Sequence, residues 1–397
     1  MHRRSTASGR LGRAANQPGV TGLVIGLVCV AIGSASMGLN SGVVVGRLLE
    51  GDERKRDSGF TLYYLGSTLG ILIGVAATGP LQAAFGFHVG FGFAAITLII
   101  GSLVYWPNRQ APHQAAPGPT DPISRSALTR LAAIALIGAA LLAGVLVVGI
   151  PLGLNPAAVV AGIATIAAGG YFIRIFVSAK VQRTERVRVR RYLPAFLGTL
   201  LFCLLYQQLL TTIAIHSEAG TDRRIFGIEV PASSLLTAAP FCTIVLGFYL
   251  VYLWSRLGTR QPSPETKFAI GLAITGIAIL ALAVSAAVSA SSPLWLVVLI
   301  VFAFGATDAI VSPTGISMAT EVAPTAFKAQ MLSLHYLSAA IGTSLAGVIA
   351  QIYLPGKNDA SYFGALAIVT LAAAAAFLAL RMLQRHRGVP ALLAPVG

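Results

Sequence analysis

Long apolar runs follow one another along almost the whole of this 397-residue chain, and they restrict its possible folds more than any other feature. Eleven of them approach or exceed the roughly 20 residues that a helix needs to cross about 30 Å of hydrocarbon. They cover residues 19–46, 59–82, 87–106, 127–150, 155–178, 193–216, 231–255, 268–289, 293–316, 329–354 and 361–382. The sequence therefore predicts an all-α, polytopic membrane protein built as a helical bundle.

Composition supports this class and excludes others. Only 10% of the residues are charged, against about 25% in a soluble domain. The net charge of +15 would suggest nucleic-acid binding in a soluble protein, but here the Lys and Arg residues gather between the apolar runs, so we expect no nucleic acid as partner. Cys29, Cys203 and Cys242 lie inside apolar runs without metal-ligand spacing, and they are expected to be small core residues.

The basic loops also predict the orientation of the chain. Connections rich in Lys and Arg alternate with connections that are nearly neutral or mixed, and basic loops belong in the cytoplasm. This places the C-terminus in the cytoplasm. The same alternation puts the tail of residues 1–18, with its four arginines, on the outer side. This disagrees with the positive-inside rule, by which arginine-rich segments stay in the cytoplasm. Either the start is unusual or helices are missing upstream.

The chain divides into segments by composition. Residues 1–18 form a basic tail, 19–106 a partial N-terminal bundle of three helices, and 107–126 a linker rich in Pro, Ala and Gln. Residues 127–192 hold a helix pair with a basic loop, 193–382 a six-helix bundle, and 383–397 a second tail. The basic loop from Lys180 to Arg191 would suit anionic lipid headgroups, although such loops usually only fix the topology.

Asp308 is the one carboxylate well inside an apolar run, and it marks the candidate site. An acid within a membrane is costly unless it faces protein or water, so it points to function. Ser312 and Pro313 follow one turn later, and this sequence predicts a weakened helix of the kind that lines a cavity. The alternative is an acid that only forms a hydrogen bond with Ser312 or with a neighbouring helix.

Several motifs resemble the proton-coupled oligopeptide transporter family, a branch of the major facilitator superfamily. The segment 57–70, with Asp-Ser-Gly-Phe-Thr-Leu-Tyr-Tyr, follows the family signature except at Ser67 and Thr68, which replace an isoleucine and an asparagine. Similarity continues in segments 86–95, 206–208, 230–233, 264–271, 308–317, 323–324 and 341–347. Motifs in the right order over most of the chain make the match specific.

The resemblance implies two six-helix bundles around a central cavity, with two extra helices inserted between them. Residues 19–46, 59–82 and 87–106 then match the fourth to sixth helices, 127–178 the inserted pair, and 193–382 the second bundle. The family's first three helices have no counterpart, which agrees with the position of the basic tail.

The departures fall on residues that handle protons and peptide in the family. A lysine is replaced by Gly38, a glutamate by Gln207, an asparagine by Ala239 and a tryptophan by His335. A family acid that meets the peptide's amino terminus is retained as Asp308, one methylene shorter than the family's glutamate. Loss of the lysine and glutamate together leaves no unpaired buried charge, so we expect it to weaken proton coupling more than stability.

The candidate substrate and proton site comprises seven residues, namely Tyr63, Tyr64, Thr68, Gln207, Asp308, Ser312 and His335. Gln207 either lines the cavity or bonds a neighbouring helix, and it cannot titrate. Tyr63 and Tyr64 contact substrate or pack in the core. His335 is a candidate titrating group, but a histidine satisfied by a backbone carbonyl is the commoner case.

The sequence thus predicts a permease of the bacterial plasma membrane that resembles proton-coupled di/tripeptide symporters and works by rocking of two half-bundles. The alternatives are a remnant or scaffold of the same fold that does not transport, and an uncoupled permease for another small solute. The expected partners are a small peptide and the lipid bilayer. The chain carries no phosphate-binding loop, nucleophile elbow or metalloprotease motif, so we expect no enzyme activity and no cofactor, with protons as the coupling ion.

Overall fold

The computed structural model describes residues 33–34, 36–50, 53–108, 152–221, 238–289 and 291–386, with short pieces between 124 and 138 and between 224 and 229. Within these residues the chain is almost entirely helical. Besides turns and short connections, these residues contain a pair of two-residue antiparallel strands, β1 (Arg224–Ile225) and β2 (Ile228–Glu229). The predicted all-α membrane class is therefore confirmed in the part that the structure describes.

The helices follow the predicted apolar runs closely. They are α3 (Glu53–Phe85), α4 (Phe87–Asn108), α7 (Pro156–Val177), α8 (Arg183–Gln208), α9 (Ala214–Gly220), α11 (Ala238–Leu257), α12 (Pro264–Val288), α13 (Leu294–Glu321), α14 (Lys328–Ile349) and α15 (Asp359–His386). Residues 36–48 are also mostly helical. Seven helical stretches among the described residues are long and apolar enough to span a membrane. The predicted span 127–150 lies largely outside the described residues, as do both predicted tails.

Local signals outside the apolar runs set several helix ends. Asn155 caps α7, where its side chain accepts from the backbone N–H of Ala157 at 2.9 Å. Helix α8 begins well before the predicted residue 193, because Glu185 in its first turn accepts from the backbone N–H of Gln182 at 2.9 Å. Between α8 and α9, residues Leu209–Ile213 form one π-helical turn.

Helix α13 runs through Pro313 without a break. The predicted weakening at Ser312 and Pro313 therefore does not end or divide the helix. Proline removes only one backbone donor, and here the packed neighbours on both sides hold α13 in place. Asp308 consequently projects from a continuous helix, near its middle.

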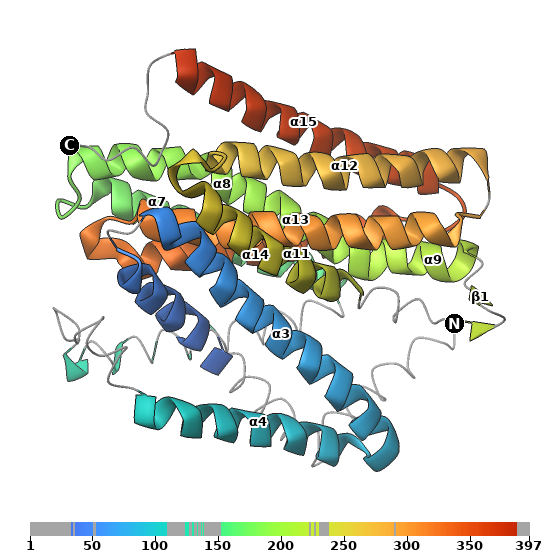
Figure 1. Cartoon of the computed structure of the whole chain (residues 1–397), viewed down its shortest axis with the longest axis horizontal. Helices are drawn as coiled ribbons and strands as arrows, with labels where there is room; N and C mark the ends of the chain where they lie inside the picture. Colours follow the sequence, from blue (N-terminus) through green and yellow to red (C-terminus); the bar gives the residue numbers. More distant parts are fainter. Residues whose placement is uncertain are drawn as a thin grey trace.

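The C-terminal helices form the core of the molecule. Helix α12 lies along α15, while α14 packs against both α7 and α8 (Figure 1). Helix α3 crosses this bundle, packs against α11 and α13, and leads into α4. Large apolar side chains such as Phe248, Ile277 and Trp295 remain exposed on the outside. A protein surrounded by lipid has such a surface, because hydrocarbon replaces water there.

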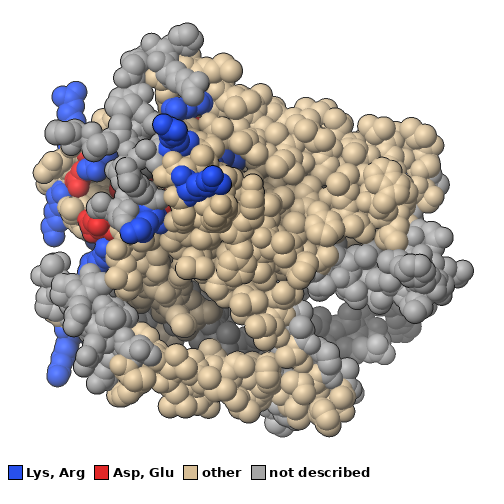
Figure 2. Space-filling view, viewed as in Figure 1, with Lys and Arg blue, Asp and Glu red and all other residues tan. Residues whose placement is uncertain are grey.

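The charges gather at one end of the molecule. Figure 2 shows the described Lys and Arg side chains clustered at the left end, while the rest of the visible surface carries hardly any charge. The first turns of α8 contribute exposed arginines there, among them Arg183, Arg188 and Arg190. We call this end the basic end, and it includes the first residues of α3 and α12.

Candidate functional site

A cavity of about 560 Å³ lies between α3, α8, α11, α13 and α14. This volume falls in the range of roughly 300–1,000 Å³ that small-molecule sites occupy. Apolar and aromatic side chains make up most of the wall, with a few polar groups among them. The lining residues are Tyr64, Thr68, Ile71, Leu72, Phe202, Cys203, Tyr206, Gln207, Leu210, Pro240, Asp308, Ser312 and Thr343.

Asp308 is the acid in this wall, and three hydroxyl groups hold its carboxylate. Oδ1 accepts from Ser312 at 2.6 Å and from Tyr64 at 2.8 Å. Oδ2 accepts from Thr243 of α11 at 3.2 Å. The side chain is only 5% exposed, and no Lys or Arg among the described residues forms an ion pair with it. The carboxylate is therefore surrounded by neutral donors that come from three different helices.

Five of the seven predicted site residues come together at this cavity, namely Tyr64, Thr68, Gln207, Asp308 and Ser312. Asp308 bonds Ser312 and a facing hydroxyl, as one alternative expects, and it also lines a cavity, so its functional role stays a prediction. The Thr68 hydroxyl is engaged on its own helix, where it donates to the Tyr64 carbonyl at 3.0 Å. Gln207 reaches the cavity from α8, beside Tyr206.

Two predicted residues lie elsewhere. The Tyr63 hydroxyl is 2.8 Å from the hydroxyl of Ser41, in the helix of residues 36–48, so it is tethered between two helices. His335 is buried on α14 and is not among the cavity-lining residues. Its ring lies against Gly315, where an added Cβ would come within 2.8 Å of it. His335 therefore packs α14 against α13.

Sequence reasoning did not single out Thr243 or Lys267. Thr243 is fully buried and is the single threonine of α11, which gives no signal by itself. Lys267, at the start of α12, is 2.5 Å from Asp57 of α3, and Ser317 of α13 donates to the other oxygen of Asp57 at 2.8 Å. Asp57 and Lys267 have opposite charges, and each lies just before a predicted apolar run. This shared position is a signal that could have suggested their contact.

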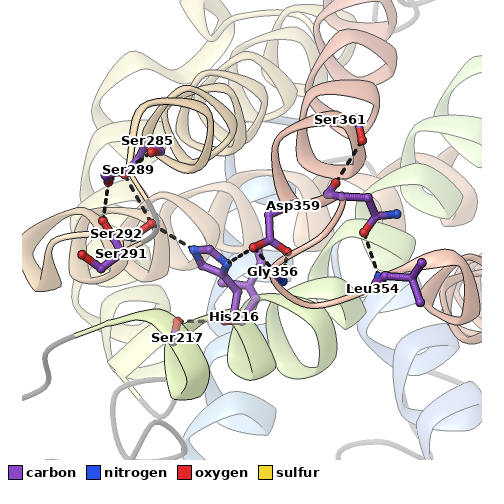
Figure 3. Close-up of polar contacts among 12 residues, drawn as sticks. His216, Ser217, Ser285, Ser289, Ser291, Ser292, Leu354, Gly356, Asp359 and Ser361 are labelled. Atoms are coloured by element: carbon purple, nitrogen blue, oxygen red, sulfur yellow. Dashed lines mark hydrogen bonds and ion pairs between the residues drawn. The ribbon is translucent and has the colours of Figure 1, made fainter.

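A second polar cluster (Figure 3) lies beside α9, at the end opposite the basic end (Figure 1). His216 of α9 approaches Ser292 through Nε2 at 2.9 Å and Asp359 through Nδ1 at 3.4 Å. This serine, histidine and aspartate chain resembles that of a hydrolase in its order of contacts. Yet Ser292 is only 2% exposed, and none of the three lines the cavity. The cluster therefore joins the ends of α9, α13 and α15.

No group of His, Cys, Asp and Glu among the described residues could hold a metal ion. The expectation that no metal or cofactor takes part stays a prediction. What the cavity offers is one carboxylate, several hydroxyls and an amide, inside an apolar wall. Such a site can take up a proton or bind a small cationic solute.

Comparisons with known proteins agree with this arrangement. The chain is 28% identical over 354 residues to the uncharacterized transporter YclF of Bacillus subtilis (strain 168), covering 87% of this chain and 71% of that protein. It is 28% identical over 366 residues to a di-/tripeptide transporter of Lactococcus lactis subsp. lactis (strain IL1403), covering 88% and 73%.

Solved structures show the same fold. A mutant of the peptide transporter POT in complex with alafosfalin superposes with a TM-score of 0.70 at 27% identity, over 92% of this chain and 76% of that one. A POT family transporter in complex with 5-aminolevulinic acid gives a TM-score of 0.68 at 25% identity, over 85% and 72%. The family profile of PTR2, the POT family, matches residues 8–367. This multi-pass membrane protein therefore belongs to the POT family of transporters.

Proposed function

We propose that this protein is a proton-coupled symporter of di- and tripeptides in the bacterial plasma membrane, with its basic end and its C-terminus in the cytoplasm. Relatives that are 27–28% identical over 366 residues include di-/tripeptide transporters, which supports this class of substrate. The charge of the basic end supports the orientation, because Lys and Arg are retained on the cytoplasmic side.

The observation that carries the proposal is the position of Asp308. A carboxylate has about four lone-pair positions, and three hydroxyl donors occupy three of them here. One position remains for a proton or for an N–H of a peptide ammonium group. Because the acid has no cationic partner among the described residues, an ammonium ion would supply the missing positive charge. Proton and peptide would thus act on the same group.

The contacts of α3 suggest how the two sides of the cavity move. Arg56 donates to Thr320 at 2.8 Å and Asp57 pairs with Lys267, so the first turns of α3 are fixed to α12 and α13 at the basic end. Further along α3, Thr68, Ile71 and Leu72 line the cavity instead. Release of the contacts at the basic end would let the N-terminal helices rock against the C-terminal bundle around Asp308.

Uptake of a labelled dipeptide by proteoliposomes tests the proposal. With an inward proton gradient, we expect accumulation that competing alafosfalin or 5-aminolevulinic acid reduces. Asp308→Asn should lower gradient-driven accumulation at least about fivefold, since couplings between two ligands typically correspond to 5–150-fold. Asp308→Glu, which keeps a titrating acid, is the matched control. No accumulation by the wild-type protein would refute symport, and an unchanged Asp308→Asn variant would remove the acid from the mechanism.

A further inference from the structure

Thr243 of α11 is placed so that its one hydroxyl proton has three acceptors. Its Oγ1 lies 3.1 Å from the carbonyl oxygen of Ala239, 3.1 Å from that of Gly305 and 3.2 Å from Oδ2 of Asp308. A hydroxyl has one proton to donate and two lone pairs to accept with. At any moment, therefore, Thr243 donates to one of the three oxygens and can still accept a hydrogen bond.

Close packing of α11 against α13 creates this arrangement. A Cβ added at Gly305 would lie 2.5 Å from the Ala239 carbonyl oxygen and 3.2 Å from the backbone nitrogen of Thr243. Only glycine allows the two backbones to approach so closely. The approach brings the Gly305 carbonyl to the Thr243 hydroxyl, one turn before Asp308 on α13. The geometry is thus built into the helix contact and does not depend on a mobile side chain.

The two oxygens of Asp308 differ in what surrounds them. Oδ1 already accepts from Tyr64 and Ser312, so it has no room for a proton of its own. Oδ2 faces Thr243, which can act as donor or acceptor. The other titratable side chains around Asp308 are Cys203 and Tyr206 of α8 and Cys242 of α11, and thiols and phenols are ordinarily neutral at pH 7. His335 of α14 packs against Gly315, two turns further along α13.

We propose that Thr243 is the positioning residue that lets Asp308 exchange a proton at Oδ2 while both of its charge states remain hydrogen-bonded, an inference that rests on the proposed symport. In the ionised state Thr243 donates to Oδ2. When Oδ2 takes up a proton, the acid donates to Thr243 Oγ1, and the threonine turns its own proton to the carbonyl of Gly305 or Ala239. No heavy atom has to move, and neither state leaves a buried polar group without a partner.

Infrared titration of purified protein in lipid nanodiscs tests this directly, because a protonated carboxyl group has a carbonyl band that can be assigned by its loss in Asp308→Asn. Thr243→Val keeps the size of the side chain and removes the hydroxyl. The ionised acid then loses a charge-assisted hydrogen bond, which is about twice as strong as the neutral bond that the protonated acid loses. We expect the half-titration pH of the band to rise by roughly one pH unit, while Thr243→Ser restores the wild-type value.

Thr243→Ala provides a second variant without the hydroxyl in case the valine disturbs folding. Equal half-titration pH in wild-type, Thr243→Val and Thr243→Ala proteins would overturn the inference, and so would the lack of a band that Asp308→Asn removes. The infrared result does not depend on transport. If the wild-type protein fails to accumulate dipeptide but the band shifts as described, the symport proposal fails while the role of Thr243 at the acid stands.

Discussion

Asp308 and Asp359 are two largely buried carboxylates of the same helical bundle, and their partners differ in kind. Hydroxyl groups of Tyr64, Thr243 and Ser312 surround Asp308, beside a cavity. Asp359 lies in the first turn of α15, where both of its oxygens accept from the backbone N–H of Gly356 at 3.1 and 3.2 Å, and His216 lies beside it. The donors to Asp308 are hydroxyl groups that can turn, whereas the hydrogen bonds to Asp359 come from a fixed backbone N–H, with the His216 ring beside it.

This difference separates a site for exchange from a site for support. A backbone N–H can only donate, so it suits a carboxylate that stays ionised. A hydroxyl can donate or accept, so it suits a group that changes its charge. The Asp359 cluster joins the ends of three helices (Figure 3), and none of its residues lines the cavity, as expected of a structural contact. Asp308 also bonds three helices, but it lines the cavity, and its donors are hydroxyl groups.

The largest effect on stability is expected at a third carboxylate, Asp57, which pairs with a cation. Lys267 is 1% exposed, bonds Asp57 and Gln261, and lies 4.2 Å from the ring centre of Trp254. Lys267→Met leaves Asp57 with Ser317 but without its cationic partner. Breaking a buried pair costs about 3–5 kcal/mol, and because the Asp57 side chain is 14% exposed we expect about 3 kcal/mol, measured as a fall in the thermal unfolding midpoint in detergent.

The double variant Asp57→Asn with Lys267→Met is the control for this prediction. It removes both charges together, so its loss of stability should be clearly smaller than that of Lys267→Met alone. Equal losses of stability in the two variants would mean that the pairing of the Asp57 and Lys267 charges does not contribute to stability.

A smaller effect is expected when the two compared acids are changed to asparagine. Asp359→Asn keeps one oxygen for the Gly356 N–H but removes the charged partner of His216, so the free energy of unfolding should fall by about 1–2 kcal/mol. Asp308→Asn should leave it unchanged within about 0.5 kcal/mol, because a buried charge without a cation is replaced by a neutral amide. Thermal midpoints of both variants measure this.

Dipeptide uptake should show the reverse of this order in stability, with the larger loss in Asp308→Asn and the smaller loss in Asp359→Asn. The Asp359→Asn protein is expected to retain dipeptide accumulation driven by the proton gradient, while Asp308→Asn loses it. Should Asp359→Asn abolish accumulation at wild-type stability, the distinction between the two sites would be wrong.

Most of the helices could be predicted, because their positions follow from the lengths of the apolar runs in the sequence. The predicted runs 268–289 and 293–316 lie almost wholly within α12 and α13. The ends of helices are harder to predict where polar residues extend a helix beyond its apolar run, as at Arg183. Capping and not hydrophobicity decides where such a helix begins. Asp308 could be found because an acid within an apolar run is rare enough to be a signal.

The rest of the site depends on tertiary packing that no local pattern reveals. Thr243 matters only because Gly305 lets two helices touch, and those residues are far apart in the chain. His335 has the right residue type at a matching position, yet its ring faces Gly315 and not the cavity. A family position predicts which helix a residue is on, but the side chains that pack around it decide where it points.

The smallest effect is expected at Thr68, which lines the cavity as Asp308 does but has its hydroxyl engaged on its own helix. Thr68→Val removes a bond to the Tyr64 carbonyl that competes with the bonds of the helix itself, so stability should change by less than about 0.5 kcal/mol. Dipeptide uptake should stay within about twofold of wild type, and the carbonyl band of Asp308 should titrate unchanged. Thr243→Val, the same substitution at a hydroxyl that reaches the acid, should shift that band. Equal shifts from both variants would mean that any hydroxyl near the cavity affects the acid, and a turning donor would then not be what distinguishes Asp308 from Asp359.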